Sequence, residues 1–229
     1  MGGAPLNLGN LAEVPEVQGV YQLFYDRKLV YIGKTDADAG LKRRLERHSS
    51  KVQHRQNLTP ALLSFKAVRV FVFTAMDLEA HLIEHYREVS RASWNNSGFG
   101  ANDPGRNRDH TEIDPTNFDA RFPIDIDRPL DGDFSGTRSA AAVAMNLKNM
   151  LPYTFRFQSS APKSRKPHAD LQSASLIISS EAATTRAITT ELTRQLPSGW
   201  QATAFRSHVI LYRERVDDYP AAIILARSD

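Results

Sequence analysis

The sequence predicts an α+β protein with a compact ββαβα core, a small mixed sheet, and a second small α/β or α+β unit. Three observations support this. Two short apolar runs flank a polar turn, which indicates a β-hairpin. Two later segments repeat apolar residues at helical spacing, with a strand-like run between them. The composition then changes near Ser139, which predicts domains over 1–135 and 136–229.

Gly19–Phe24 and Leu29–Gly33 are predicted to pair around the turn Asp26-Arg27-Lys28. Successive side chains of a strand point to opposite faces, so the loop length decides which residues share a face. A two-residue loop separates Tyr21 from Tyr31, whereas a three-residue loop brings both to one face. Shared chemistry at these tyrosines therefore predicts a loop of odd length.

The remaining elements of the first domain follow from residue pattern. Residues 1–15 are expected to form a loose arm. We expect a helix over Leu41–Val52, a third strand over Ala67–Phe73, and a longer helix from Asp77 to about residue 90. Trp94 to Gly105 contains three glycines, one proline and three asparagines, which excludes regular structure.

The second domain is predicted from the same kinds of pattern. It follows an acidic, proline-punctuated segment that runs from Arg106 to Asp133. Helices are expected over Ala140–Leu151 and Glu181–Leu196, and strands over Tyr153–Gln158, Ser173–Ser179, Gln201–Phe205, His208–Arg213 and Ala221–Ala226.

Composition narrows the functional class. The chain has no cysteine, which excludes disulfides and thiolate metal sites and fits a reducing cytoplasm. No long apolar run is present, so we expect a cytoplasmic protein without a membrane span. Residues 40–73 carry eight Lys and Arg against one Glu, whereas residues 101–135 carry nine Asp and Glu against four Arg. The basic stretch suits a nucleic-acid backbone.

One motif indicates a reaction class. Gly19-Val20-Tyr21 is followed by Val30-Tyr31-Ile32-Gly33-Lys34, and then by Arg44 and His48 four residues apart. This pattern resembles the signature of the GIY-YIG nuclease superfamily, whose members are metal-dependent enzymes that cut phosphodiester bonds. The segment from Trp94 to Arg108 resembles the WN…GFG…DPG segment of a group of GIY-YIG type II restriction endonucleases. The resemblance covers about residues 18–110.

The resemblance implies roles for these residues. Tyr21 would orient or deprotonate the attacking water, and Tyr31 would help to position it. Arg44 is always charged and suits stabilisation of the phosphate in the transition state. His48, on the same helix face, is either a proton shuttle or a hydrogen-bond partner of the tyrosine.

The metal ligand leaves two candidates. Glu79, in Glu79-Ala80-His81-Leu82-Ile83, matches the family pattern and borders the apolar stripe of its helix. Glu84 lies twelve residues before Asn96, closer to the family interval, but belongs to the polar side. A single carboxylate with waters suits Mg²⁺, with Mn²⁺ as a substitute. Asn95 matches the family's asparagine, and His81 and His85 are interpreted as surface residues.

The resulting hypothesis is a Mg²⁺-dependent DNA endonuclease that makes site-specific double-strand cuts as a homodimer, alongside a companion DNA methyltransferase. A low-specificity effector or repair nuclease, and a DNA-binding protein that does not cut, are the alternatives. The expected catalytic residues are Tyr21, Tyr31, Arg44, His48, Glu79 and Asn95. The expected DNA contacts are Lys34, Lys42, Arg43, Arg47, Lys51 and Arg55.

Overall fold

The computed structural model describes residues 3–35, 40–70, 75–87, 93–95, 97–100, 103 and 105–229. It confirms the α+β class and divides into two compact units. The first unit contains residues 1–101 and 115–122, and the second contains residues 102–114 and 123–229. The chain therefore passes between the units three times, whereas composition predicts a single boundary near residue 135.

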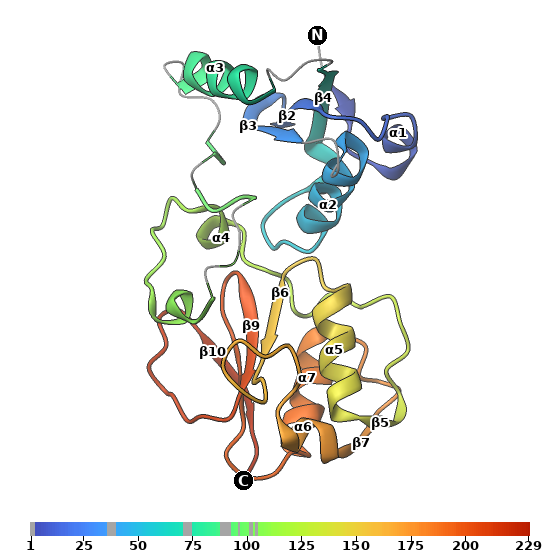
Figure 1. Cartoon of the computed structure of the whole chain (residues 1–229), viewed down its shortest axis with the longest axis vertical. Coiled ribbons are helices and arrows are strands. Elements are labelled where there is room, and N and C mark those ends of the chain that lie inside the picture. The colour runs from blue at the N-terminus through green and yellow to red at the C-terminus, as the bar shows by residue number, and fades with distance from the viewer. Residues whose placement is uncertain are drawn as a thin grey trace. The chain divides into compact units, whose positions relative to one another are not determined.

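The first unit is built on a four-stranded sheet with the order β1-β4-β2-β3 (Figure 1). Every pairing in it is antiparallel, so the expectation of a mixed sheet is wrong for this unit. The third predicted strand begins at Leu63 rather than Ala67, because Leu63, Phe65 and Ala67 alternate onto the buried face. The strands are β1 (Ala4–Pro5), β2 (Gly19–Tyr25), β3 (Lys28–Thr35) and β4 (Leu63–Arg69).

Helices pack on both faces of this sheet. Leu11 of α1 (Leu8–Ala12) and Leu45 of α2 (Leu41–Gln53) are fully buried in one cluster with Tyr21. On the opposite face, Leu82 and Ile83 of α3 (Ala75–Arg87) pack near Val20, Leu29 and Ile32. Within residues 4–12, β1 pairs with β4 and the side chains of Leu6 and Leu11 are buried in the core, which corrects the expectation of a loose arm. The predicted end of this helix, at about residue 90, lies outside the described residues.

The β2–β3 hairpin corrects the predicted loop. Tyr25 pairs with Lys28, so the loop has two residues, and Asp26 and Arg27 have φ angles of 48° and 62°. Those positive angles are typical of a type I′ turn. The register then shifts between Leu23 and Phe24. The shift is a β-bulge at Val30, and this extra residue restores the parity that the short loop would have broken.

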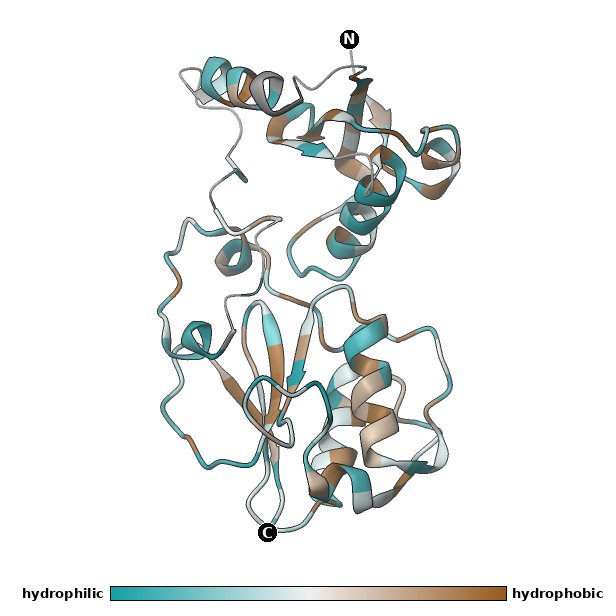
Figure 2. Cartoon of the chain, in the orientation of Figure 1, coloured by the Kyte–Doolittle hydropathy of each residue, from teal (hydrophilic) through white to brown (hydrophobic). Residues whose placement is uncertain are grey.

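The second unit contains a mixed sheet with the order β10-β8-β9-β6, in which only β6 and β9 are parallel. Leu147 of α5 and Leu192 of α7 are fully buried in its main core. Figure 2 shows this apolar material along the strands and on α5, whereas α2 of the first unit is mostly hydrophilic on its visible side. The elements are α5 (Ala140–Met150), β6 (Thr154–Phe157), α6 (Ala169–Ser173), α7 (Thr185–Arg194), β8 (Gln201–Ala204), β9 (His208–Tyr212) and β10 (Ile223–Arg227), with β5 (Gly136–Ser139) and β7 (Ser175–Ile178) as a separate pair.

Three short helices complete the description: 3₁₀ turns over Pro60–Leu62 and Gly105–His110, and α4 over Phe118–Arg121. Among the described residues, no helix has both the length and the apolar character that a membrane crossing requires.

Candidate active site

Tyr21 and Tyr31 share one face of the sheet. Tyr21 pairs with Gly33 and Leu23 pairs with Tyr31, which places the tyrosine rings on adjacent strands with centroids 6.1 Å apart. Gly33 is needed for this arrangement, because a Cβ atom at that position would collide with the Tyr21 hydroxyl. Both tyrosines are buried, at 1% and 8% exposure. The bulge at Val30 therefore brings the two tyrosines together.

Helix α2 supplies two polar side chains to the Tyr21 hydroxyl. The hydroxyl lies 2.7 Å from Nε2 of His48, and Nε of Arg44 donates a hydrogen bond to it at 3.3 Å. Arg44 and His48 are four residues apart, so both project from the helix face that packs on the sheet. The structure thus brings together four of the six predicted catalytic residues: Tyr21, Tyr31, Arg44 and His48.

Burial keeps both partners of the Tyr21–His48 hydrogen bond neutral. It raises the pKa of Tyr21, and the Tyr31 phenol adds to this rise while Arg44 opposes it. Burial also lowers the pKa of His48 well below its usual value, and the charges of Arg44, Lys51 and Arg47 lower it further. At neutral pH both groups are therefore neutral, and in the tautomer that carries its proton on Nδ1 the Tyr21 hydroxyl donates to Nε2 of His48.

The loop that follows α3, of which residues 93–95 and 97–100 are described, forms one wall of the site and is called the wall loop below. The Phe99 ring stacks on His48, with centroids 4.8 Å apart and an interplanar angle of 20°. Gly100 has φ +79°, and a Cβ atom there would lie 2.8 Å from the Tyr31 hydroxyl. Neither residue is among the predicted site residues. The signal in the sequence is the Gly98-Phe99-Gly100 triplet, since two positive φ angles exclude most other residues.

Asn95 has a structural role at the edge of the sheet. Its side-chain amide accepts a hydrogen bond from the Ile32 N–H at 2.8 Å and donates one to the Ile32 carbonyl at 2.9 Å. Trp94 N–H donates to the Val30 carbonyl at 2.7 Å. Strand β3 lies at the edge of the sheet, so these bonds satisfy backbone groups that an edge strand leaves open. Asn95 thereby anchors the wall loop rather than contacting the Tyr21 hydroxyl.

Glu79 lies on the other face of β3. Its carboxylate forms an ion pair with Lys34 at 3.1 Å. Lys34 pairs with Val20 in the sheet, and strand alternation places both on the face that α3 covers. Lys34 nevertheless directly follows Gly33, over which the Tyr21 hydroxyl lies. Glu79 is therefore at the same end of β3 as the tyrosine cluster, but on the opposite side of the strand.

The other candidates on α3 are in solvent. Glu84, His81 and His85 are exposed, which agrees with the interpretation of the two histidines as surface residues. Asn96, whose spacing supported Glu84, lies outside the described residues. Within the described part of the chain, no group of three or more His, Asp or Glu side chains could hold a metal ion.

The predicted DNA contacts divide into two groups. Arg55 does not fit the prediction: its side chain is 2% exposed, and it forms an ion pair with Asp119 at 2.7 Å and donates to the Phe122 carbonyl at 2.9 Å. It is a buried structural residue, because these partners take the place of water. The others are at least partly exposed, although Lys34 is paired with Glu79 and the Lys51 ammonium lies over the Phe99 ring: Lys34, Lys42, Arg43, Arg47 and Lys51.

Comparison with known proteins adds no relative. No protein-family model matches the chain, and no curated protein matches it. Only the residues and their geometry bear on its function. A buried tyrosine hydroxyl between a neutral histidine and an arginine can accept a proton, pass one on, and act beside a bound anion.

Proposed function

We propose that this chain is a Mg²⁺-dependent DNA endonuclease that hydrolyses phosphodiester bonds at the Tyr21 hydroxyl. The observation that supports this is the contact of Tyr21 with both His48, at 2.7 Å, and Arg44, at 3.3 Å. A proton acceptor and a fixed cation on one hydroxyl are what attack by water on a phosphate diester requires.

The proposed reaction is a proton relay. A water molecule attacks phosphorus, and its proton passes to the Tyr21 oxygen while the Tyr21 proton passes to Nε2 of His48. The bond from phosphorus to the leaving oxygen breaks, and His48 becomes an imidazolium that can return a proton. The relay needs no free phenolate, which the raised pKa of Tyr21 disfavours. Arg44 donates to the phosphoryl oxygens as their negative charge grows.

The Glu79 carboxylate fits a magnesium ion held by one protein ligand. Its side chain is 21% exposed, so its oxygens are accessible, and Lys34 shows that a cation already lies beside it. Mg²⁺ commonly keeps several waters and takes few protein carboxylates. Because Glu79 and Tyr21 lie on opposite sides of β3, the ion would supply Lewis-acid polarisation to a phosphoryl oxygen only of a phosphate that spans the Gly33 end of this strand. Lys34 would move from the carboxylate toward the DNA backbone.

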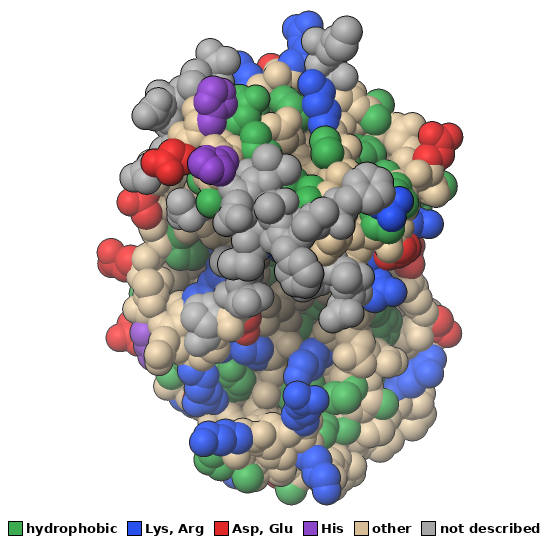
Figure 3. Space-filling view, turned by 45° about the horizontal axis from the view of Figure 1, so that its top comes forward, with side chains coloured by type: hydrophobic (Ala, Val, Ile, Leu, Met, Phe, Trp, Pro, Cys, Tyr) green, Lys and Arg blue, Asp and Glu red, His purple; other side chains and the backbone are tan. Residues whose placement is uncertain are grey.

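The finer proposal is a type II restriction endonuclease that acts as a homodimer on double-stranded DNA. It is supported by the resemblance of the wall loop, whose Phe99 and Gly100 contact the tyrosine cluster. One site per protomer would cut one strand each, so a two-fold dimer would cut both. Residues 136–229 carry twelve Lys and Arg against seven Asp and Glu, although the second unit as a whole is balanced, with fifteen of each. Figure 3 shows many Lys and Arg side chains on the lower part of its visible face.

The test is digestion of a supercoiled plasmid by the full chain with Mg²⁺. Tyr21→Phe should lower the cleavage rate about 100-fold or more, since it removes the relay and little else. Tyr153→Phe is the matched control, because it also removes a buried hydroxyl, one that bonds Thr185 at 2.7 Å in the second unit. Glu79→Gln and EDTA should each abolish cleavage.

The products separate the alternatives. Discrete fragments support a restriction enzyme, and a smear supports a nuclease of low specificity. DNA that is bound but left intact would favour a non-catalytic DNA-binding protein. Equal cleavage by wild type and Tyr21→Phe would contradict the proposed site.

A further inference from the structure

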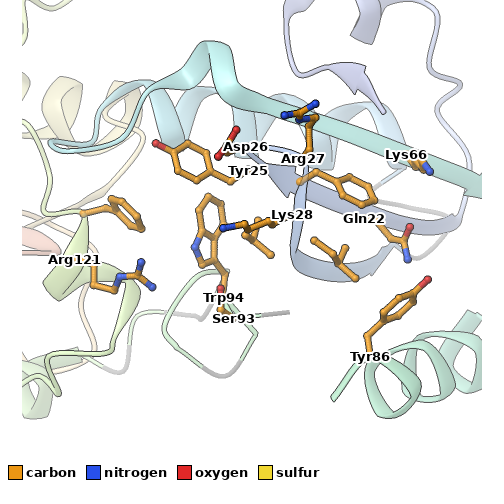
Figure 4. Close-up of a pocket in the computed structure, with 14 residues that line it drawn as sticks. Gln22, Tyr25, Asp26, Arg27, Lys28, Lys66, Tyr86, Ser93, Trp94 and Arg121 are labelled. Carbon is orange, nitrogen blue, oxygen red and sulfur yellow. The ribbon is translucent and has the colours of Figure 1, made fainter. Parts of the chain in front are cut away.

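A cavity of about 750 Å³ lies at the turn end of the β2–β3 hairpin (Figure 4). This volume falls within the range of about 300–1,000 Å³ that is typical of small-ligand sites. Phe24 of β2 and Lys66 of β4 line it from the sheet, and Tyr86 from the end of α3. In Figure 4 the Lys28 side chain extends toward Trp94, which lines the cavity from the loop.

The cavity exists because α3 covers only part of its face of the sheet. Phe24 and Lys66 lie on the same face as Val20 and Ile32, since strand residues alternate. Leu82 and Ile83 of α3 pack near Val20 and Ile32. The hairpin end of this face therefore keeps its side chains accessible, with Phe24 half-buried and Lys66 exposed.

The lining combines aromatic rings with positive charge. Its four cations are all exposed, and the only carboxylate in the lining is Asp26. The ammonium group of Lys66 lies 5.4 Å from the centroid of the Phe24 ring. An apolar ligand would leave these charges without a role, and a simple anion would not use the rings. The cations are Arg27, Lys28, Lys66 and Arg121.

We propose that this cavity binds one unstacked nucleotide, with its base against the Phe24 and Tyr86 rings and its phosphate near Lys28 and Lys66. Stacking of bases on aromatic side chains combined with a cationic backbone track is how proteins bind single strands. The cavity extends along β2 from Gln22 to Tyr25, and Phe24 lies about 10 Å along the strand from Tyr21 at 3.3 Å per residue, on the opposite face of the sheet. The choice of a DNA strand as the source of the nucleotide rests on the proposed nuclease function.

Binding can be measured without cleavage. The full chain is titrated into a fluorescein-labelled oligothymidine in EDTA, and anisotropy gives the Kd. Lys28→Gln/Lys66→Gln should raise this Kd about tenfold more than Arg165→Gln/Lys166→Gln, which removes the same charge from exposed positions of the second unit. Phe24→Leu should raise it at least about fivefold, because a stacking surface is lost.

The outcomes are separate for the two proposals. If the two charge-removing variants lose the same amount of affinity for the oligonucleotide and Phe24→Leu has no effect on the Kd, the cavity assignment is overturned and the nuclease proposal stays intact. If these variants lose binding and the wild-type protein cuts no DNA, the cavity assignment is supported and the nuclease proposal is overturned. Displacement of the oligonucleotide by free thymidine monophosphate supports the cavity with a free nucleotide as its ligand. Displacement only by a longer strand supports the cavity with DNA as its ligand.

Discussion

At the scale of single residues, burial determines what each titratable group can do. Tyr21 and His48 are both buried, at 1% and 4% exposure, and desolvation favours the neutral form of each. A hydroxyl and an imidazole that are both neutral can share one proton at 2.7 Å, whereas a phenolate or an imidazolium would be costly there. The relay proposed for Tyr21 passes through an imidazolium at His48, so it requires the negative charge that grows on the phosphate to offset this cost.

The depressed pKa of His48 has a consequence for stability. The unfolded state protonates its histidine first as the pH falls, so the free energy of unfolding should decrease below about pH 6.5, by up to about 1.4 kcal/mol per pH unit. The full contribution is present above that pH. His48→Gln should show a weaker pH dependence, because a glutamine side chain carries no titratable group.

The measurement is urea unfolding of wild type and His48→Gln at about pH 7 and about pH 5.5. His208, whose pKa is also lowered by burial, leaves a residual slope in the variant. Identical slopes for the two proteins would show that His48 is not buried in its neutral form.

At the scale of elements, the bulge in β3 determines which side chains face the candidate site. A two-residue turn alone would send Tyr31 to the α3 face, and the extra residue at Val30 returns it to the Tyr21 face. The turn itself is under strain, because Asp26 and Arg27 both have positive φ without being glycine. A side chain in this left-handed region costs about 1 kcal/mol.

Relief of that strain should stabilise the hairpin. Arg27→Gly should raise the free energy of unfolding by up to about 1 kcal/mol, because glycine adopts the left-handed conformation without steric cost. Arg27→Ala removes the same charge but keeps the Cβ atom, so it should bring no such gain. Thermal unfolding of the three proteins compares them directly, and a gain for both variants would assign the effect to charge rather than to backbone strain.

At the scale of the whole molecule, each crossing segment is held by buried charge inside its own unit. Arg55 and Asp119 pair within the first unit. In the second unit, Asp109 accepts hydrogen bonds from Arg156 and lies 2.8 Å from Nε2 of His208. Burial alone would raise the pKa of Asp109, but His208 and Arg156 lower it below its usual value. These pairs explain why segments 105–110 and 117–122 belong to different units.

Removal of Asp109 should therefore cost more than removal of an exposed acid. Asp109→Ala leaves the buried His208 without its carboxylate partner and leaves Arg156 with Asp103 alone, so the free energy of unfolding should fall by about 3 kcal/mol. Asp131→Ala, at an exposed position, should change it by less than about 0.5 kcal/mol. Urea unfolding followed by circular dichroism gives both values, and a wild-type value for Asp109→Ala would contradict the structural role.

The sequence by itself determined the longer elements and their order, because strand alternation, helical spacing and turn residues are local patterns, but it did not indicate the short β1, α1 and α4. Residues four apart in α2 also had to share a face, so the pairing of Arg44 with His48 was predictable. The tertiary structure decided four features: the bulge in β3, the burial of Arg55, the hydrogen bonds of Asn95 at the edge of β3, and the face of the sheet on which Glu79 lies. Each depends on a partner distant in sequence: Asp119 lies 64 residues from Arg55, and Ile32 lies 63 residues from Asn95. A local pattern carries no record of such partners, since only the packed fold brings them into contact.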